Sequence, residues 1–147
     1  MQSGYIIDLQ LQNKKELPFL KVSSLELEEG IGIIGDCHSI GGEKQVALIS
    51  LEAKQWMESQ ASSGLCVARF HENMVTQGID YSLLERGECI ETESIALQIS
   101  IYSKRCFSEC ELVRDEKPCN LKKGILFAKV LKSGTIHVGE RIWTSKT

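Results

Sequence analysis

Six cysteines are the residues of this 147-residue chain best suited to chemistry, and their spacing narrows what that chemistry can be. No two of them form the Cys-x-x-Cys pattern of a zinc knuckle or a thioredoxin-type redox site. The last three follow one another at spacings of four and nine residues, which leaves a three-thiol metal site possible but matches no structural zinc pattern well. The six are Cys37, Cys66, Cys89, Cys106, Cys110 and Cys119.

Cys106 differs from the other thiols in its neighbours. Lys104 and Arg105 precede it directly, at the point where a strand predicted over Ile95–Tyr102 should end. Adjacent cations lower the pKa of a thiol, and the thiolate is the form that binds a soft metal or accepts a sulfur atom. The alternative is an inert loop cysteine with unrelated basic neighbours. Cys66 stands between Leu65 and Val67, and Cys89 stands in a predicted strand, so both are expected to be small buried side chains.

The three histidines give one further candidate. His71 begins a His-Glu-x-x sequence, but the second histidine of a zinc protease helix is missing. His137 alternates with apolar neighbours and is predicted to be an exposed strand residue. Asp36, Cys37 and His38 form a polar triplet in a loop flanked by glycines, which makes His38 and Asp36 candidate site residues.

Common nucleotide and hydrolase motifs are absent. The sequence has no Gly-x-x-x-x-Gly-Lys loop, no Gly-x-Ser-x-Gly elbow, and no dinucleotide fingerprint, since no suitable helix follows the glycines of Gly30–Gly35. Three glycines in this segment predict unusual backbone angles or close backbone approach. Its amides are candidates to bind a phosphate.

Short strands must position these residues. Apolar and polar side chains alternate in several of the predicted strands, whereas one predicted strand, Val46–Ser50, begins with four apolar residues and is expected to be buried. Ser50 can cap the one predicted helix, Leu51–Glu58. The segments Arg86–Ile90 and Val138–Ile142 share the pattern Gly-acid-x-Ile, and each stands at the start of a predicted strand. The prediction is a mainly β barrel with one or a few short helices. The other strands are predicted at Tyr5–Gln12, Ser24–Glu28, Glu88–Glu93, Ile95–Tyr102, Ile125–Leu131, Ile136–Val138 and Arg141–Thr144.

The composition fits a single soluble domain over residues 1–147. Hydrophobic residues make up 42% and charged residues 25%, which are ordinary values for a globular protein. The formal charge of −3 gives no general attraction to nucleic acid or an anionic membrane. Neither a signal-peptide pattern nor an apolar run of about 18 residues is present, so we expect reduced thiols and a cytoplasmic location.

Several segments, in order along nearly the whole chain, resemble the MOSC domain, named for the C-terminal domain of molybdenum cofactor sulfurases. Gly32–His38 fits the family pattern Gly-x-x-Gly-Asp-x-His, and Lys44–Ile49 fits the basic-Gln-Val-x-Leu-Ile stretch, with Lys44 where arginine is usual. Phe70–Gly78 fits Phe-x-Glu-Asn-x-x-Thr-x-Gly, and Leu84–Glu88 fits Leu-x-x-Gly-acid.

The last third is similar to a small stand-alone subgroup of the family. That subgroup has a basic-x-Cys motif, two further cysteines and a closing Gly-x-Phe-Ala-basic-Val-Leu stretch, which Gly124–Leu131 fits with one extra residue. Larger members carry Pro-Arg where this chain has Tyr102 and Ser103, so the contacts of that arginine are not carried over.

The resemblance implies a MOSC-type barrel in which Cys106 is the reactive cysteine, ligating molybdenum or carrying sulfur as a persulfide for cofactor maturation. The sulfur would come from a separate PLP-dependent cysteine desulfurase, and the acceptors would be molybdoenzymes or cofactor-biosynthesis proteins. The soft, anionic molybdenum–pterin group needs a thiolate, cations and backbone donors. The residues expected to supply or support these contacts are Cys106, Lys104, Arg105, Lys44, Asp36, His38, Glu72 and Asn73.

Three functions stay open. The first is cofactor binding or sulfur transfer through Cys106. The second is a molybdenum-dependent reductase of N-hydroxylated compounds, which would need a separate electron-transfer partner because the chain has no Fe–S or flavin motif. The third is a non-catalytic partner protein in which the last three cysteines bind a metal. Glu72 and Asn73 also have a structural alternative, which is to fix a turn.

Overall fold

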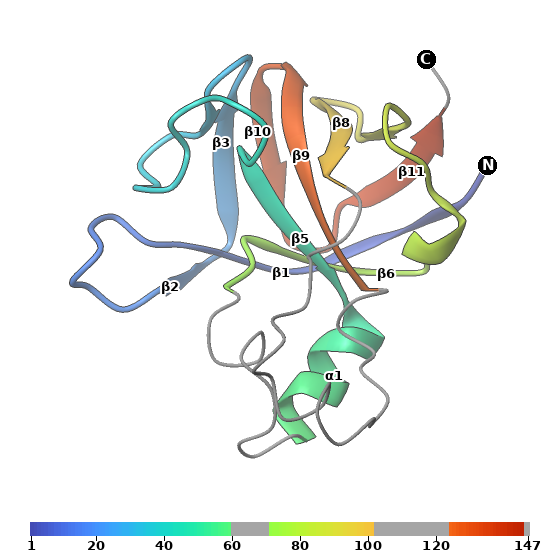
Figure 1. Cartoon of the computed structure of the whole chain (residues 1–147), viewed down its shortest axis with the longest axis horizontal. Coiled ribbons are helices and arrows are strands. Elements are labelled where there is room, and N and C mark those ends of the chain that lie inside the picture. Colours follow the sequence, from blue (N-terminus) through green and yellow to red (C-terminus); the bar gives the residue numbers. More distant parts are fainter. Residues whose placement is uncertain (60–70, 102–123, 146–147) are drawn as a thin grey trace, which may run out of the picture.

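The computed structural model describes residues 1–59, 71–101 and 124–145, and shows strands wrapped into a barrel with one α-helix at its end (Figure 1). The elements in chain order are β1 (Ser3–Leu11), β2 (Leu20–Val22), β3 (Ser24–Glu28), β4 (Gly32–Ile33), β5 (Val46–Ser50), α1 (Leu51–Ser59), β6 (Met74–Gln77), the 3-10 turn η1 (Tyr81–Leu83), β7 (Cys89–Glu91), β8 (Ala96–Ile101), β9 (Ile125–Lys132), β10 (Gly134–His137) and β11 (Arg141–Ser145).

Seven of these strands close into a barrel. They pair in the order β11, β7, β8, β9, β5, β6 and β1, and β1 pairs with β11 to complete the ring. The pairing of β5 with β6 is parallel, and the others are antiparallel. The strand β2 extends the sheet beside β1, and β10, β3 and β4 form a second, three-stranded sheet. The predicted mainly β barrel is therefore confirmed.

The alternation of side chains explains both the core and the place of α1. Val46 and Leu48 of β5 join the main core cluster, while Ala47 and Ile49 join a second cluster on the other face. Ala53 of α1 packs into that second cluster. This is why β5 is buried along its whole length: one face meets the main core and the other meets the helix.

The sequence predictions for the larger elements hold. Ser24–Glu28 and Val46–Ser50 are strands with the predicted bounds, and the helix begins at Leu51 as expected. Ser50 caps it, because its hydroxyl oxygen accepts a hydrogen bond of 3.2 Å from the amide of Ala53. The repeated Gly-acid pairs precede β7 and β11, which are neighbours in the barrel, and Gly87 and Gly139 both have positive φ.

Three strands were not predicted: β2, β4 and β6. Two of them have two or three residues, too few to show a period. Three of the four residues of β6 are buried, so it shows no alternation either. Among the described residues, no helix is long and apolar enough to cross a membrane.

Candidate functional site

Asp36 lies buried in the loop between β4 and β5 and ties that loop to the end of β1. Its Oδ1 accepts a hydrogen bond of 2.9 Å from the amide of Gln12, and its Oδ2 accepts one of 3.3 Å from Ser39. The amide of Cys37 donates to the carbonyl of Gln12 at 2.8 Å. The carboxylate of Asp36 is therefore engaged in holding the loop.

At least three of the six amides of the glycine-rich segment Gly30–Gly35 are used in hydrogen bonds within the protein. The amides of Gly30, Ile31 and Ile34 donate to backbone carbonyls at 2.8–3.1 Å. Gly32 has φ +129° and packs against Ser39, where any side chain would overlap neighbouring atoms. The unusual backbone angles predicted here are confirmed, and they serve close packing of the loop.

His38 is an exposed side chain positioned by Gln12. Its Nε2 lies 2.6 Å from Gln12 Oε1. The amide group of Gln12 has a defined orientation, because its Nε2 donates to the carbonyls of Lys15 and Leu17 at 3.1 and 2.7 Å. Since Oε1 can only accept, Nε2 of His38 must carry the proton. Neutral His38 thus keeps an unprotonated Nδ1.

An aromatic stack links His38 to the start of β6. The Phe19 ring stacks on both His38 and His71, with centroid distances of 6.0 and 4.9 Å. Within the described part of the chain, no group of three or more His, Cys, Asp or Glu side chains is arranged to hold a metal ion.

Glu72 and Asn73 are buried where β1, β5 and α1 meet. A carboxylate oxygen of Glu72 lies 2.8 Å from Lys54 Nζ, which pairs the start of β6 with the helix. The side chain of Asn73 accepts a hydrogen bond of 3.1 Å from the amide of Ala47 and donates one of 3.2 Å to the carbonyl of Gln10. Both side chains therefore connect separate segments of the barrel.

Lys44 lies apart from these groups. Its Nζ sits 5.2 Å from the centroid of the Phe127 ring, a cation–π contact on the outside of β9. The structure thus brings Asp36 and His38 together through Gln12, and Glu72 and Asn73 together through Gln10, while Lys44 joins neither pair. Lys104, Arg105 and Cys106 lie outside the described residues, as do Cys66, Cys110 and Cys119.

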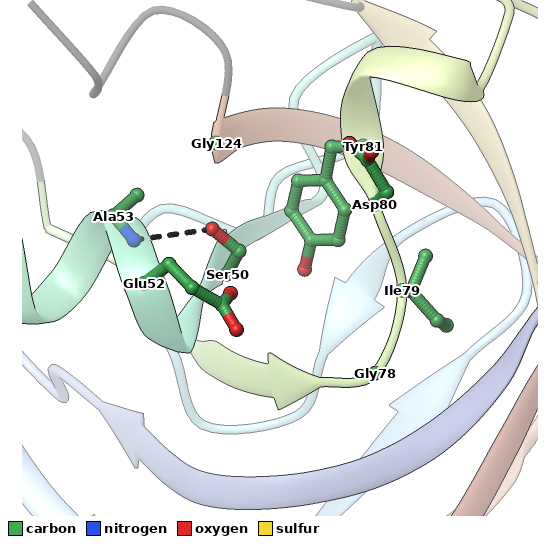
Figure 2. A pocket seen from close by; sticks show the side chains of 8 residues that line it. All are labelled: Ser50, Glu52, Ala53, Gly78, Ile79, Asp80, Tyr81 and Gly124. Atoms are coloured by element: carbon green, nitrogen blue, oxygen red, sulfur yellow. Dashed lines mark hydrogen bonds between the residues drawn. The ribbon is translucent and has the colours of Figure 1, made fainter.

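A pocket of about 530 Å³ opens beside the first turn of α1 (Figure 2). The parallel pairing of β5 with β6 creates it, because Ser50 and Thr76 are register partners and both chains leave the barrel at the same end. The described residues lining it come from those two exits and the start of β9: Ser50, Glu52, Ala53, Gly78, Ile79, Asp80, Tyr81 and Gly124.

Two glycines set the shape of this end of the barrel. Gly78 has φ +97°, and a Cβ on it would lie 2.9 Å from Gly4 Cα, so β1 and the chain after β6 cross in close contact. Gly124 faces Ala53 and Ser50, where a Cβ would overlap both side chains. Larger residues at either position would displace the wall of the pocket.

Three polar side chains line the pocket, those of Ser50, Glu52 and Tyr81. In Figure 2 the carboxylate of Glu52 and the hydroxyl of Tyr81 extend towards the same region, whereas the hydroxyl of Ser50 points towards the amide of Ala53. The Tyr81 hydroxyl also shares a hydrogen bond of 2.6 Å with the buried Thr76 hydroxyl. Burial raises the pKa of Tyr81 well above its usual value and Glu52 raises it further, against the lowering effect of Thr76. Tyr81 is therefore a neutral phenol at physiological pH.

Sequence reasoning missed Glu52, Asp80 and Tyr81 as pocket residues. A signal was present in the Phe-x-Glu-Asn-x-x-Thr-x-Gly motif, because Thr76 contacts Tyr81 and Gly78 lines the pocket. Glu72 and Asn73 were predicted as site residues because of their chemistry. It is the later half of the motif, with Thr76 and Gly78, that reaches the pocket. Cys89 is buried as expected, and burial, with Glu91 close by, raises the pKa of its thiol.

The fold is shared with solved structures of low sequence identity. The YuaD protein from Bacillus subtilis matches with a TM-score of 0.74 and 18% identity over 100% of both chains. YiiM from Escherichia coli matches with a TM-score of 0.61 and 15% identity, over 100% of this chain and 71% of that one. YiiM from Geobacillus stearothermophilus has a TM-score of 0.60 and 17% identity, over 97% and 75%.

No curated protein matches the sequence. The family model of the MOSC domain matches residues 35–143, which is most of the chain and includes the loop of Asp36, the pocket and the segment that bears Cys106. The motif order and the barrel agree with this match, and the chain belongs to the MOSC domain family.

Proposed function

We propose that this MOSC protein binds molybdenum cofactor or carries sulfur for its maturation, with Cys106 as the metal-ligating or persulfide-forming thiolate. The observation that carries the proposal is the position of the pocket relative to β8 and β9. Ile101 ends β8 and pairs with Phe127 of β9, and Gly124, just before β9, lines the pocket. The segment bearing Lys104, Arg105 and Cys106 joins these two strands.

Chain length supports placing Cys106 near this end of the barrel. Cys106 follows Ile101 by five residues, and five residues of fully extended chain span at most about 18 Å. The described cysteines are less suited to the role: Cys89 is buried with a raised pKa, and Cys37 lies half-buried beside Gln12.

The pocket fits one end of a pterin cofactor. Glu52, Ser50 and Tyr81 present oxygen atoms, which suit the N–H groups of a pterin ring, and Ala53 and Ile79 supply apolar surface. None of the described lining residues is basic, so phosphate would have to be bound by cations such as Lys104 and Arg105. When bound, the cofactor would supply a soft metal centre for oxygen or sulfur exchange.

Sulfur transfer through Cys106 is a balanced exchange. The Cys106 thiolate would attack the outer sulfur of a persulfide on a PLP-dependent cysteine desulfurase. The S–S bond of the donor breaks, its cysteine leaves as a thiolate, and Cys106 becomes the persulfide. Lys104 and Arg105 favour this step because neighbouring cations stabilise the attacking thiolate. A molybdoenzyme or a cofactor-biosynthesis protein would accept the sulfur.

The test is mass spectrometry with metal analysis of the native protein from a cofactor-replete host. Wild type is expected to hold molybdenum–pterin or a sulfane sulfur on Cys106, and Cys106→Ser to lose both. Cys37→Ser is the matched control and should retain the wild-type content. Equal molybdenum and sulfane-sulfur content in wild type and Cys106→Ser would overturn the proposal. Stoichiometric zinc without molybdenum or sulfane sulfur would instead favour a structural metal bound by the last three cysteines.

A second candidate is reduction of N-hydroxylated compounds at the same cofactor. The pocket volume of about 530 Å³ favours it, because a small heterocycle has room beside the cofactor ring. This reaction requires electrons from a separate partner. Turnover of a hydroxylaminopurine by the molybdenum-loaded protein with a reducing partner, lost in Cys106→Ser, would select the reductase over the sulfur carrier.

A further inference from the structure

Glu52 is a charged group of the pocket for which the described residues supply no ion-pair partner. It is exposed on the first turn of α1. The other pocket carboxylate, Asp80, already has hydrogen-bond partners within the protein. Its Oδ1 accepts hydrogen bonds of 3.0 and 2.6 Å from the amide and hydroxyl of Ser82. Glu52 is therefore available to a ligand.

The polar groups around Glu52 extend its hydrogen-bonding surface. Ser50 Oγ accepts from the amide of Ala53, which leaves the hydroxyl proton of Ser50 free to be donated. Tyr81 brings a second hydroxyl from the other side of the pocket, held in place by Thr76 (Figure 2). The helix dipole alone accounts for an acidic residue in the first turn, but not for the two hydroxyl groups that line the same pocket.

We propose, building on the function proposed above, that Glu52 recognises the 2-amino-4-oxopyrimidine edge of a planar heterocycle. This edge, shared by pterins and guanine, presents two adjacent N–H groups that match the two oxygens of one carboxylate. The Ser50 hydroxyl is the nearby donor for a ring oxygen or nitrogen. Ile79 and Ala53 provide apolar contact for the ring.

The negative charge of the described pocket lining favours the heterocyclic end of a ligand over a phosphate end. Glu52 and Asp80 both repel a phosphate, and the described lining contains no basic residue. A ligand with a heterocycle at one end and a phosphate at the other would therefore enter ring first. The carboxylate of Glu52 then selects by the N–H pattern of the ring.

Fluorescence titration of the purified full-length apoprotein with pterin and with lumazine tests the assignment. Lumazine carries an oxygen in place of the 2-amino group of pterin, so the two ligands differ at the proposed contact. Wild type should prefer pterin by roughly ten- to a hundredfold, the range expected for hydrogen bonds to a charged group. Guanosine, titrated as a third ligand, shows whether a purine or the pterin ring of the cofactor is the better source of this edge.

Glu52→Gln should lose the preference, because the amide replaces one acceptor by a donor. Glu58→Gln removes the same charge from the last turn of α1 and should keep the wild-type preference. Equal binding of pterin and lumazine to wild type, no binding of either, or an unchanged preference in Glu52→Gln would each overturn the assignment.

This readout is independent of the metal. The titration uses the apoprotein, so its outcome does not depend on molybdenum or sulfane sulfur at Cys106. A wild-type protein that holds neither molybdenum nor sulfane sulfur but prefers pterin would refute the Cys106 proposal and leave the role of Glu52 supported.

Discussion

Gln12 Oε1 accepts a hydrogen bond from Nε2 of His38 at 2.6 Å and so selects one tautomer of this exposed histidine. The selection follows from the two carbonyls that fix the amide group of Gln12. A residue at the end of β1 thereby decides which nitrogen of His38 can act as a base or a ligand.

The tautomer of His38 is directly measurable. In proton–nitrogen NMR spectra of neutral His38, wild type should show the proton on Nε2 and an unprotonated Nδ1. Gln12→Leu should give a mixture of tautomers, because the acceptor for Nε2 is lost. His137, whose Nδ1 lies 3.5 Å from Glu140, is the internal control and should not change. A proton on Nδ1 of His38 in wild type would contradict the assignment.

Asn73 is expected to be a major structural contact of the barrel. Asn73→Ala leaves the amide of Ala47 and the carbonyl of Gln10 without their side-chain partner, and should lower the free energy of unfolding by about 2–3 kcal/mol. Urea denaturation measures the change. Asn13→Ala, in the exposed turn after β1, is the control and should change stability by less than about 0.5 kcal/mol. Equal effects of the two substitutions would refute the structural role of Asn73.

Tyr81 should limit stability at high pH. Its pKa is raised in the folded state above the usual value of 10.0, so the folded protein resists losing the phenolic proton. The stability contribution is complete below about pH 10 and is lost as pH rises above that value, by up to about 1.4 kcal/mol per pH unit. Denaturation of wild type and Tyr81→Phe between pH 8 and 11 measures this slope. Identical pH profiles would contradict the prediction.

The Thr76–Tyr81 pair gives an independent check of the same contact. Thr76→Val and Tyr81→Phe each leave one buried hydroxyl without its partner, whereas the double variant removes both. A double-mutant cycle should give a coupling of about 1 kcal/mol or more. Additive effects would show that the 2.6 Å contact contributes little to stability.

Gly124 should tolerate no larger residue while α1 keeps its position. The Cβ of Gly124→Ala would overlap Ala53 and Ser50, which forces the helix away from β9 and should cost about 1–3 kcal/mol. The double variant Gly124→Ala with Ala53→Gly removes one of the overlaps and should recover part of the loss, after allowing about 1 kcal/mol for glycine in a helix. Thermal unfolding measures the stability of the single and the double variant. A Gly124→Ala protein as stable as wild type would show that the pocket wall can move to accept the methyl group.

Most of the barrel could be predicted from local patterns, because each barrel strand has an inside and an outside. Leu97 and Ile99 are buried and alternate with the partly exposed Ala96 and Gln98 along β8 for this reason, and Ser50 marked the start of α1. The strand β6 could not be predicted this way. Met74, Val75 and Thr76 are all buried, because β6 lies between β1 and β5 and its outer face meets the second core cluster.

The sequence indicated which polar residues to consider for the candidate site, but not how their side chains are arranged. The motifs drew attention to Asp36, His38, Glu72 and Asn73, and hydrogen bonds to neighbouring segments explain much of why polar residues stand there. Local sequence does not show whether a carboxylate faces a ligand or an amide of its own chain, because the partner comes from a distant strand.

The sequence by itself determined the family and the mainly β architecture, since motif order and the alternation of side chains can be read along the chain. Only the tertiary structure decided that Ser50, Glu52 and Tyr81 share a pocket. Parallel pairing aligns Ser50 with Thr76, so the chain after β5 and the chain after β6 emerge side by side although they are far apart in sequence.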